Sequence, residues 1–116
     1  MKIKITPSHL KGSVTPPSSK SVFHRALIAA ALAKGESKIF PCAFSDDVTA
    51  TMQALRALGA AVAENGESIT VKGIKSIPDT VYINAGESGS TLRFLIPVCA
   101  ALAKRSVFSG EGRLPQ

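Results

Sequence analysis

The first candidate site is the segment 18–25, which combines serines with a lysine and an arginine at the start of a predicted helix. The first N–H groups of a helix lack partners within it, and the helix dipole adds partial positive charge there. Lys20 and Ser21 at such a position favour binding of a phosphate or carboxylate group. Arg25 follows Ser21 by four residues and shares its helix face, where the guanidinium could hold a carboxylate. The alternative for Arg25 is a structural role, at the solvent edge of the helix or in a buried ion pair.

The second candidate site is the segment 86–93, of sequence GESGSTLR, which also precedes an apolar helical pattern. Gly89 would let a ligand approach the backbone, while Ser90 and Thr91 add hydroxyl groups near Arg93. Glycine-rich segments before helices also form tight turns, so this segment alone does not separate a ligand site from a structural turn. It lacks the Gly-Lys-Ser/Thr and Gly-x-Gly-x-x-Gly patterns, which argues against nucleotide binding.

The remaining acidic and histidine residues have simpler expected roles. Asp46 and Asp47 are adjacent, do not face each other on a helix, and are expected to complement the helix dipole rather than to catalyse. His24 has no carboxylate or nucleophile partner in the sequence and is expected to be packed or hydrogen-bonded. His9 is expected to be exposed. No catalytic residue and no metal site is assigned from these residues.

Composition and charge favour a folded protein that binds anionic small molecules. The chain has 116 residues, of which 45% are hydrophobic and 19% charged, and this predicts one compact core. The net charge is +6, but the basic residues are dispersed and aromatic residues make up 5%, so no nucleic-acid surface is expected. Cys42 and Cys99 are expected to be reduced and buried. Neither a signal peptide nor a bilayer-length apolar stretch is recognisable, so we expect a cytoplasmic protein without a membrane partner.

The spacing of apolar residues, together with the capping and turn residues, predicts the helices and strands that position these side chains. Ser18 or Ser19 should cap the first helix after Pro16 and Pro17, and Ser45 should cap the second. Gly35 and Gly59 should end these two helices. The expected helices cover residues 20–34, 46–58 and 90–103, the last with Pro97 inside it. The expected strands cover residues 2–6, 12–15, 37–40, 60–63, 68–72, 80–84 and 105–108, with Asn-Gly turning an antiparallel hairpin.

An internal repeat places the two candidate sites at equivalent positions. The sequence ALAK occurs at 31–34 and again at 101–104, followed each time by a short strand pattern, with an offset of about 70 residues. The same offset carries Lys20 and Ser21 onto Ser90 and Thr91. The order of elements reads as βαβαββ with the cycle starting again, an α+β fold.

The chain resembles the amino-terminal part of the 5-enolpyruvylshikimate-3-phosphate synthase family from end to end. The motifs that carry the resemblance are PSSKSVFHRAL at 17–27, SDDVT at 45–49, LRALGA at 55–60, GESGSTLR at 86–93 and GEGR at 110–113. The resemblance implies transfer of the enolpyruvyl group from phosphoenolpyruvate to the 5-hydroxyl of shikimate 3-phosphate, in aromatic amino acid biosynthesis. It also implies an inverse α/β-barrel architecture of βαβαββ units in a two-domain, monomeric enzyme, with no metal or organic cofactor.

The resemblance assigns roles to individual residues. Lys20 would contact both substrates, and Ser21 and Arg25 would hold shikimate 3-phosphate. Gly89 and Ser90 would meet phosphoenolpyruvate, where the family's inhibitor glyphosate competes. Supporting roles fall to Thr91 and Arg93.

Two departures from the family pattern bear on activity. Ser18 stands where the family usually has glycine, and the sequence ends before the Arg-Pro that contributes to the phosphoenolpyruvate site. The acid and base groups also come from the part that follows in the family, and addition and elimination need such proton transfers. The 116-residue chain alone is therefore expected to lack turnover and to need the remainder of the enzyme.

Within the resemblance, residues 1–15 are expected to belong with the carboxy-terminal domain, 16–85 to form the first βαβαββ unit, and 86–116 to start the next. Alternatives remain. The chain could be an autonomous folding or binding module without activity, or part of the related UDP-N-acetylglucosamine enolpyruvyl transferase, although the Lys-Ser-x-x-x-Arg pattern at 20–25 suits the shikimate enzyme better. A nucleic-acid module ranks third, and steep salt dependence would reveal it.

Overall fold

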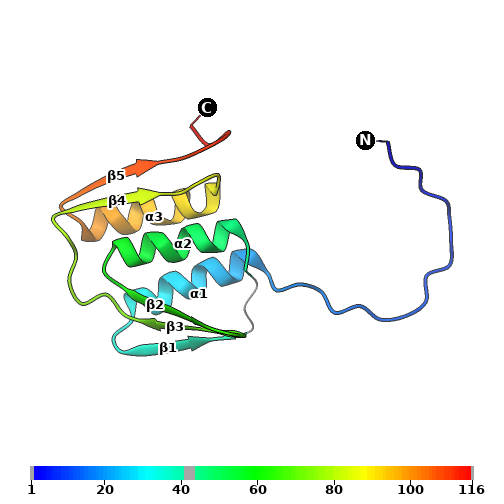
Figure 1. The fold of residues 1–116 in the computed structure, drawn as a ribbon, viewed down its shortest axis with the longest axis horizontal. Coiled ribbons are helices and arrows are strands. Elements are labelled where there is room, and N and C mark those ends of the chain that lie inside the picture. Colours follow the sequence, from blue (N-terminus) through cyan, green and yellow to red (C-terminus); the bar gives the residue numbers. More distant parts are fainter. Residues whose placement is uncertain (1, 41–43, 116) are drawn as a thin grey trace.

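The structure, a computed structural model, describes residues 2–40 and 44–115. Within these residues the chain forms helices α1 (Lys20–Leu32), α2 (Asp46–Ala57) and α3 (Gly89–Leu102). The strands are β1 (Glu36–Ile39), β2 (Ala61–Asn65), β3 (Ser68–Lys72), β4 (Thr80–Asn84) and β5 (Arg105–Ser109). Figure 1 shows the helices side by side, with their starts at the same end of the molecule. The predicted α+β class is confirmed.

Each helix start is capped by a serine. The side-chain oxygens of Ser19, Ser45 and Ser88 accept hydrogen bonds from the backbone N–H three residues ahead. These bonds satisfy N–H groups that have no partner within the helix. The predicted caps of α1 and α2 are therefore confirmed, and α3 begins one residue earlier than predicted.

The predicted end of α1 at Gly35 is wrong. Ala33 ends the helix in an extended conformation, and its N–H donates to Ala29 O. Ala103 ends α3 in the same way, with its N–H donating to Cys99 O, and α3 continues past Pro97 to this cap. The two helices thus end at Leu32 and Leu102, which have equivalent places in the predicted repeat.

The strands form two sheets that differ in direction. In the first, β3 lies between β1 and β2 and pairs antiparallel with both. The predicted hairpin of β2 and β3 is confirmed, and Gly66 takes the positive φ of +60° that its turn requires. In the second sheet β4 and β5 are parallel, so α3 serves as the crossover between them.

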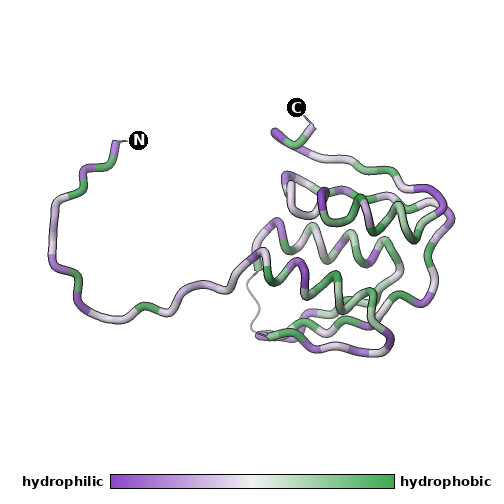
Figure 2. The backbone as a smooth tube through the Cα atoms, turned by 180° about the vertical axis from the view of Figure 1, so that it is seen from behind, coloured by the Kyte–Doolittle hydropathy of each residue, from purple (hydrophilic) through white to green (hydrophobic). Residues whose placement is uncertain are grey.

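The strands predicted over residues 2–6 and 12–15 are wrong. Residues 2–18 extend away from the helices without forming a strand (Figure 1). Ile5 and Leu10 are 86% and 93% exposed, and Figure 2 shows apolar and polar stretches alternating along the segment. The alternation is real, but a strand also needs a partner to pair with its N–H and C=O groups. Among the described residues this segment has none.

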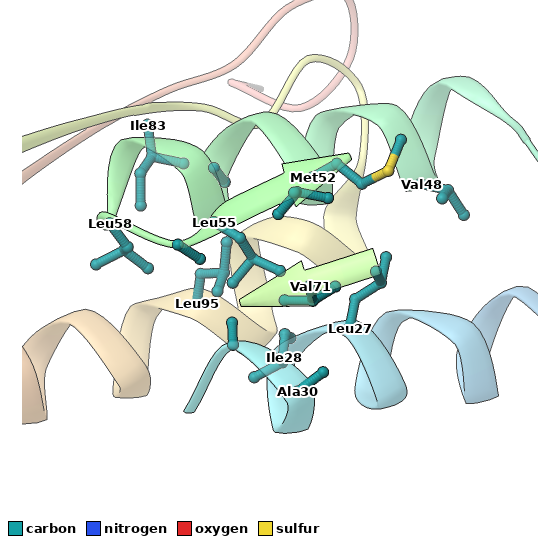
Figure 3. Packing of buried hydrophobic residues seen from close by; sticks show 14 of the residues in the cluster. Leu27, Ile28, Ala30, Val48, Met52, Leu55, Leu58, Val71, Ile83 and Leu95 are labelled. Atoms are coloured by element: carbon teal, nitrogen blue, oxygen red, sulfur yellow. The ribbon is translucent and has the colours of Figure 1, made fainter. Parts of the chain in front are cut away.

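The core lies between the helices and the inner faces of the sheets, and it holds the helix starts in place. Figure 3 shows Leu27 of α1, Met52 and Leu55 of α2 and Leu95 of α3 converging near Val71 of β3. All five side chains are fully buried. Burial of one such side chain contributes about 1.5–3 kcal/mol. Apolar residues recur at three- and four-residue spacing along α2, and the face that they form is the buried one.

Candidate functional site

The start of α1 presents Lys20 and Ser21 at the surface, as the sequence predicts. Lys20 Nζ donates a hydrogen bond to Asp47 Oδ2 at 2.9 Å, in a pair that is partly open to solvent. Asp46 and Asp47 do lie in the first turn of α2, as expected of residues that complement its dipole. The sequence did not predict that Asp47 would also bind the lysine of the neighbouring helix start.

Arg25 lies on the face of α1 that carries Ser21. Its Nη1 donates to the backbone oxygen of Ser21 at 3.2 Å, and its Cζ lies 5.1 Å from the ring centre of Phe94 on α3. A guanidinium over an aromatic face is held there by a cation–π interaction. The arginine is exposed, so of the two structural alternatives it is not in a buried ion pair. The Phe94 contact keeps its charge beside the start of α1.

The start of α3 presents Gly89 and Ser90, of which Ser90 is exposed. The φ of Gly89 lies outside the left-handed region. A Cβ built there would meet, among the described residues, no closer neighbour than Leu114 Cδ1 at 3.9 Å, an ordinary contact. Neither backbone conformation nor packing therefore requires glycine at this position. Arg93 is exposed on the same helix.

A second glycine-containing segment supports the start of α3. The N–H of Glu111 donates to Gly86 O at 2.7 Å, and Asn84 Nδ2 donates to the Glu111 carboxylate at 2.8 Å. Asn84 also accepts from the N–H of Gly86. These bonds tie the segment after β5 to the segment after β4, and so fix the backbone that leads into α3.

A chain of buried polar groups connects the three helices of the described residues. His24 Nδ1 lies 2.7 Å from Thr51 Oγ1, which in turn lies 2.7 Å from Thr91 Oγ1. Thr91 Oγ1 also reaches Ser88 Oγ at 2.8 Å and the backbone oxygen of Asp47 at 3.2 Å. His24, Thr51, Thr91 and Ser88 are all buried. The expectation of a hydrogen-bonded His24 is confirmed, and His9 is exposed as expected.

The sequence did not predict this polar chain, although it contained a signal. Thr51 stands on the apolar face of α2, between Val48 and Leu55, where a hydroxyl must find a partner if it is to be buried. Thr91 was expected only to support the second site. What the sequence could not show is that the two threonines meet.

Charge and burial set the protonation of the polar groups. Burial lowers the pKa of His24, an effect that Asp47 opposes and Lys20 assists. The hydrogen bond from Lys20 lowers the pKa of the Asp47 carboxyl. His24 is therefore neutral and Asp47 ionised at neutral pH. Burial raises the pKa of the free Cys99 thiol. Cys42 lies outside the described residues.

An acidic cavity of about 540 Å³ lies at the starts of α2 and α3. Its lining includes four carboxylates and is formed by Asp46, Asp47, Ala50, Gly86, Glu87, Ser88 and Glu111. These carboxylates would repel an anion inside the cavity. Among the described residues, no group of three or more His, Cys, Asp or Glu side chains could hold a metal ion. None of the helices there has the length and hydropathy to cross a bilayer.

The two candidate sites are connected rather than in direct contact. Lys20 is linked to Asp47, and Asp47 in turn accepts from Thr91 in the first turn of α3. Arg25 is linked to α3 through Phe94. The structure thus brings the two predicted helix starts to one end of the molecule, with the start of α2 joining them.

Known proteins are similar to this chain in sequence and in fold. The family model for EPSP synthase (3-phosphoshikimate 1-carboxyvinyltransferase) matches residues 5–116. Relatives named 3-phosphoshikimate 1-carboxyvinyltransferase include those of Clostridium perfringens, 46% identical over 115 residues, and Clostridium kluyveri, 43% identical over 113 residues. These matches cover 97% of this chain but 27% and 26% of the relatives, so the chain spans about a quarter of their length. EPSP synthase from Acinetobacter baumannii is similar in structure, with a TM-score of 0.72 and 29% identity, covering 87% of this chain and 24% of that one. On the family match, the chain belongs to the EPSP synthase family.

Proposed function

We propose that this chain is the substrate-binding portion of a 3-phosphoshikimate 1-carboxyvinyltransferase. Such an enzyme moves the enolpyruvyl group of phosphoenolpyruvate to the 5-hydroxyl of shikimate 3-phosphate and releases phosphate. The observation that carries the proposal is Gly89, a glycine at a helix start that neither its φ nor its packing requires. A missing side chain there leaves backbone N–H groups open to an anion. The family match supports the same assignment.

The proposed roles follow from charge and position. Lys20 serves both substrates, because it lies at the α1 start and is linked through Asp47 to Thr91 in the first turn of α3. Ser21 and Arg25 hold shikimate 3-phosphate, with the guanidinium N–H groups that do not bind Ser21 O donating two hydrogen bonds to its carboxylate. Gly89 and Ser90 hold phosphoenolpyruvate through the backbone and a hydroxyl. The positive ends of the helix dipoles add to the attraction for both anions.

The remainder of the enzyme supplies what this chain does not. We keep as a proposal that residues 1–15 belong with the carboxy-terminal domain, that 16–85 form the first unit, and that 86–116 begin the next. The described elements of 16–85 run α1, β1, α2, β2, β3, β4, so the strand that should open a βαβαββ unit is not among them. The reaction needs a proton delivered to the enol carbon and another removed from the hydroxyl. These groups are proposed to lie outside the matched segment, so the chain alone should bind substrate without turning it over.

Amide shifts measured by NMR test the proposal directly. Shikimate 3-phosphate added to the ¹⁵N-labelled chain should shift the signals of Ser19 to Arg25, and phosphoenolpyruvate those of Gly89 to Thr91. Signals at Gly73, which packs against Ala33 beyond the far end of α1, should stay in place. If neither substrate moves any of these signals, the chain is a folding module and the proposal is wrong. Phosphate release with both substrates present would contradict the expected lack of turnover.

A further inference from the structure

We propose that Thr51 and Thr91 are positioning residues, which set the spacing between the two helix starts so that one ligand can contact both. The inference rests on the proposed function, because it concerns the site formed by Lys20 with Gly89 and Ser90. Neither threonine touches that ligand. Their effect is exerted through the backbone of the helices that carry them.

The polar chain is attached to α1 and α3 close to their starts. His24 lies one turn beyond Lys20 on α1, and Thr91 lies two residues beyond Gly89 on α3. Thr51 lies between them on α2, and its Oγ1 is 2.7 Å from His24 Nδ1 and 2.7 Å from Thr91 Oγ1. The chain therefore crosses between helices within the turns next to the candidate site. Hydrogen bonds of this length tolerate little change in helix spacing.

All groups of the polar chain can be satisfied at once. The backbone oxygen of Asp47 can only accept, so a Thr91 hydroxyl proton directed at it leaves Thr91 Oγ1 to accept from Thr51. Thr51 Oγ1 then accepts from His24 Nδ1–H, and the other tautomer of His24 reverses the two inner bonds without breaking them. Every buried side-chain nitrogen and oxygen of the described residues has a partner in the chain or elsewhere.

The threonines differ from valines, which have the same shape, by their hydroxyl groups. Apolar side chains alone, such as the buried Leu27, Met52 and Leu95, specify a single arrangement of the helices less strictly. A buried hydroxyl costs free energy unless it is paired, so the paired threonines select the one arrangement in which they meet. In this arrangement the starts of α1 and α3 keep a fixed separation.

The test removes the hydroxyls and keeps the shape. Thr51→Val and Thr91→Val each break the chain, while Thr51→Ser and Thr91→Ser preserve it. Thr70→Val is the matched control, because Thr70 Oγ1 accepts from Asn65 Nδ2 at 3.0 Å within the β2–β3 hairpin and takes no part in the polar chain between the helices. Binding is measured from amide shifts of the 116-residue chain in two titrations, with phosphoenolpyruvate and with shikimate 3-phosphate.

The expected result is a split between the two ligands. Phosphoenolpyruvate, proposed to contact both starts, should bind the valine variants about three- to tenfold more weakly. Shikimate 3-phosphate, proposed to contact the α1 start, should weaken by less than about twofold. The serine variants and Thr70→Val should bind both ligands as the wild type does. Equal weakening of both ligands, or an equal effect of Thr70→Val, would overturn the inference.

Measurements on the unliganded chain separate this inference from the proposed function. If the wild type binds neither substrate, the proposed function is wrong, and the positioning is then decided by whether Thr51→Val moves the amide signals of Ser21 and Ser90 together. Signals that stay in place at either start would refute it. Should the valine variants not fold, Thr51→Ala and Thr91→Ala remove the same hydroxyls and take their place in both titrations. Unchanged phosphoenolpyruvate binding in folded alanine variants would overturn the inference.

Discussion

Lys20 Nζ donates to the Asp47 carboxylate at 2.9 Å. The ammonium group that the proposed ligands need is therefore already paired with an acidic side chain. The pair is partly exposed, and a pair of this kind contributes at most about 1 kcal/mol. An anionic ligand of higher charge density can therefore replace the carboxylate. Asp47 acts as an internal competitor, and its removal should help anions to bind.

Asp47→Asn should tighten the binding of inorganic phosphate at the α1 start by about two- to fivefold, because the competing charge is removed. The measurement is a phosphate titration at low salt, followed through the amide signals of Lys20 and Ser21. Asp79→Asn is the control, since it removes the same charge from the 2.7 Å pair with Lys104. Equal affinities in the two variants would contradict the prediction.

His24 should make stability depend on pH. Burial lowers its pKa in the folded state from the ordinary value of 6.5, so the unfolded state binds more protons below that pH. Its contribution is complete above about pH 6.5 and is lost as the pH falls toward the folded value, by at most about 1.4 kcal/mol per pH unit. Urea unfolding between pH 5 and pH 8, at about half-unit steps, measures it. His24→Asn should flatten this slope, whereas His9→Asn, at an exposed position, should keep it.

Gly73→Ala should destabilise the fold by about 1–3 kcal/mol, the usual range for forced overpacking. A Cβ at Gly73 would overlap the backbone oxygen of Ala33 at the end of α1. Gly89→Ala should leave the unfolding free energy within about 0.5 kcal/mol of the wild type, because the added methyl finds space. It should nevertheless weaken phosphoenolpyruvate binding. Urea titrations measure the stability, and a large loss in Gly89→Ala would show that this glycine is structural.

Arg25→Ala should weaken shikimate 3-phosphate binding by about tenfold or more, since it removes charged hydrogen bonds to the ligand. Arg93→Ala removes an equal charge from an exposed position on α3 and should change the affinity by less than about twofold. Calorimetric titration of both variants provides the comparison. An Arg25→Ala variant that loses stability but keeps its affinity would favour the structural role, with the arginine serving Phe94.

Much of the fold followed from local signals in the sequence. Ser19 and Ser45 cap helices because a hydroxyl before a helical pattern can satisfy free N–H groups, and Asn65 with Gly66 turns the hairpin. Such signals act over a few residues and need no partner from elsewhere. The apolar spacing in α2 likewise fixed which side of that helix is buried.

The errors and omissions came from interactions between distant segments. Ile3 and Ile5 have the alternation of a strand, but alternation supplies no neighbour to pair with. Thr51 and Thr91 are separated by 40 positions, and their contact depends on how α2 packs against α3. The pairing of Lys20 with Asp47 depends on helix packing in the same way. The local chemistry of each helix start was predictable, while the links between the starts were not.

The parallel pairing of β4 with β5 sets the order in which this molecule can fold. β2 and β3 are joined by a short turn and can pair early, whereas Thr80 meets Arg105 only after the whole of α3 has been placed between them. A contact between distant segments forms late, because closing the long loop between them costs conformational entropy before the contact can stabilise the chain. The segment after β5, in which the N–H of Glu111 donates to Gly86 O, should take its place later still. The α1 half of the anion site should thus exist in the folding chain before its α3 half.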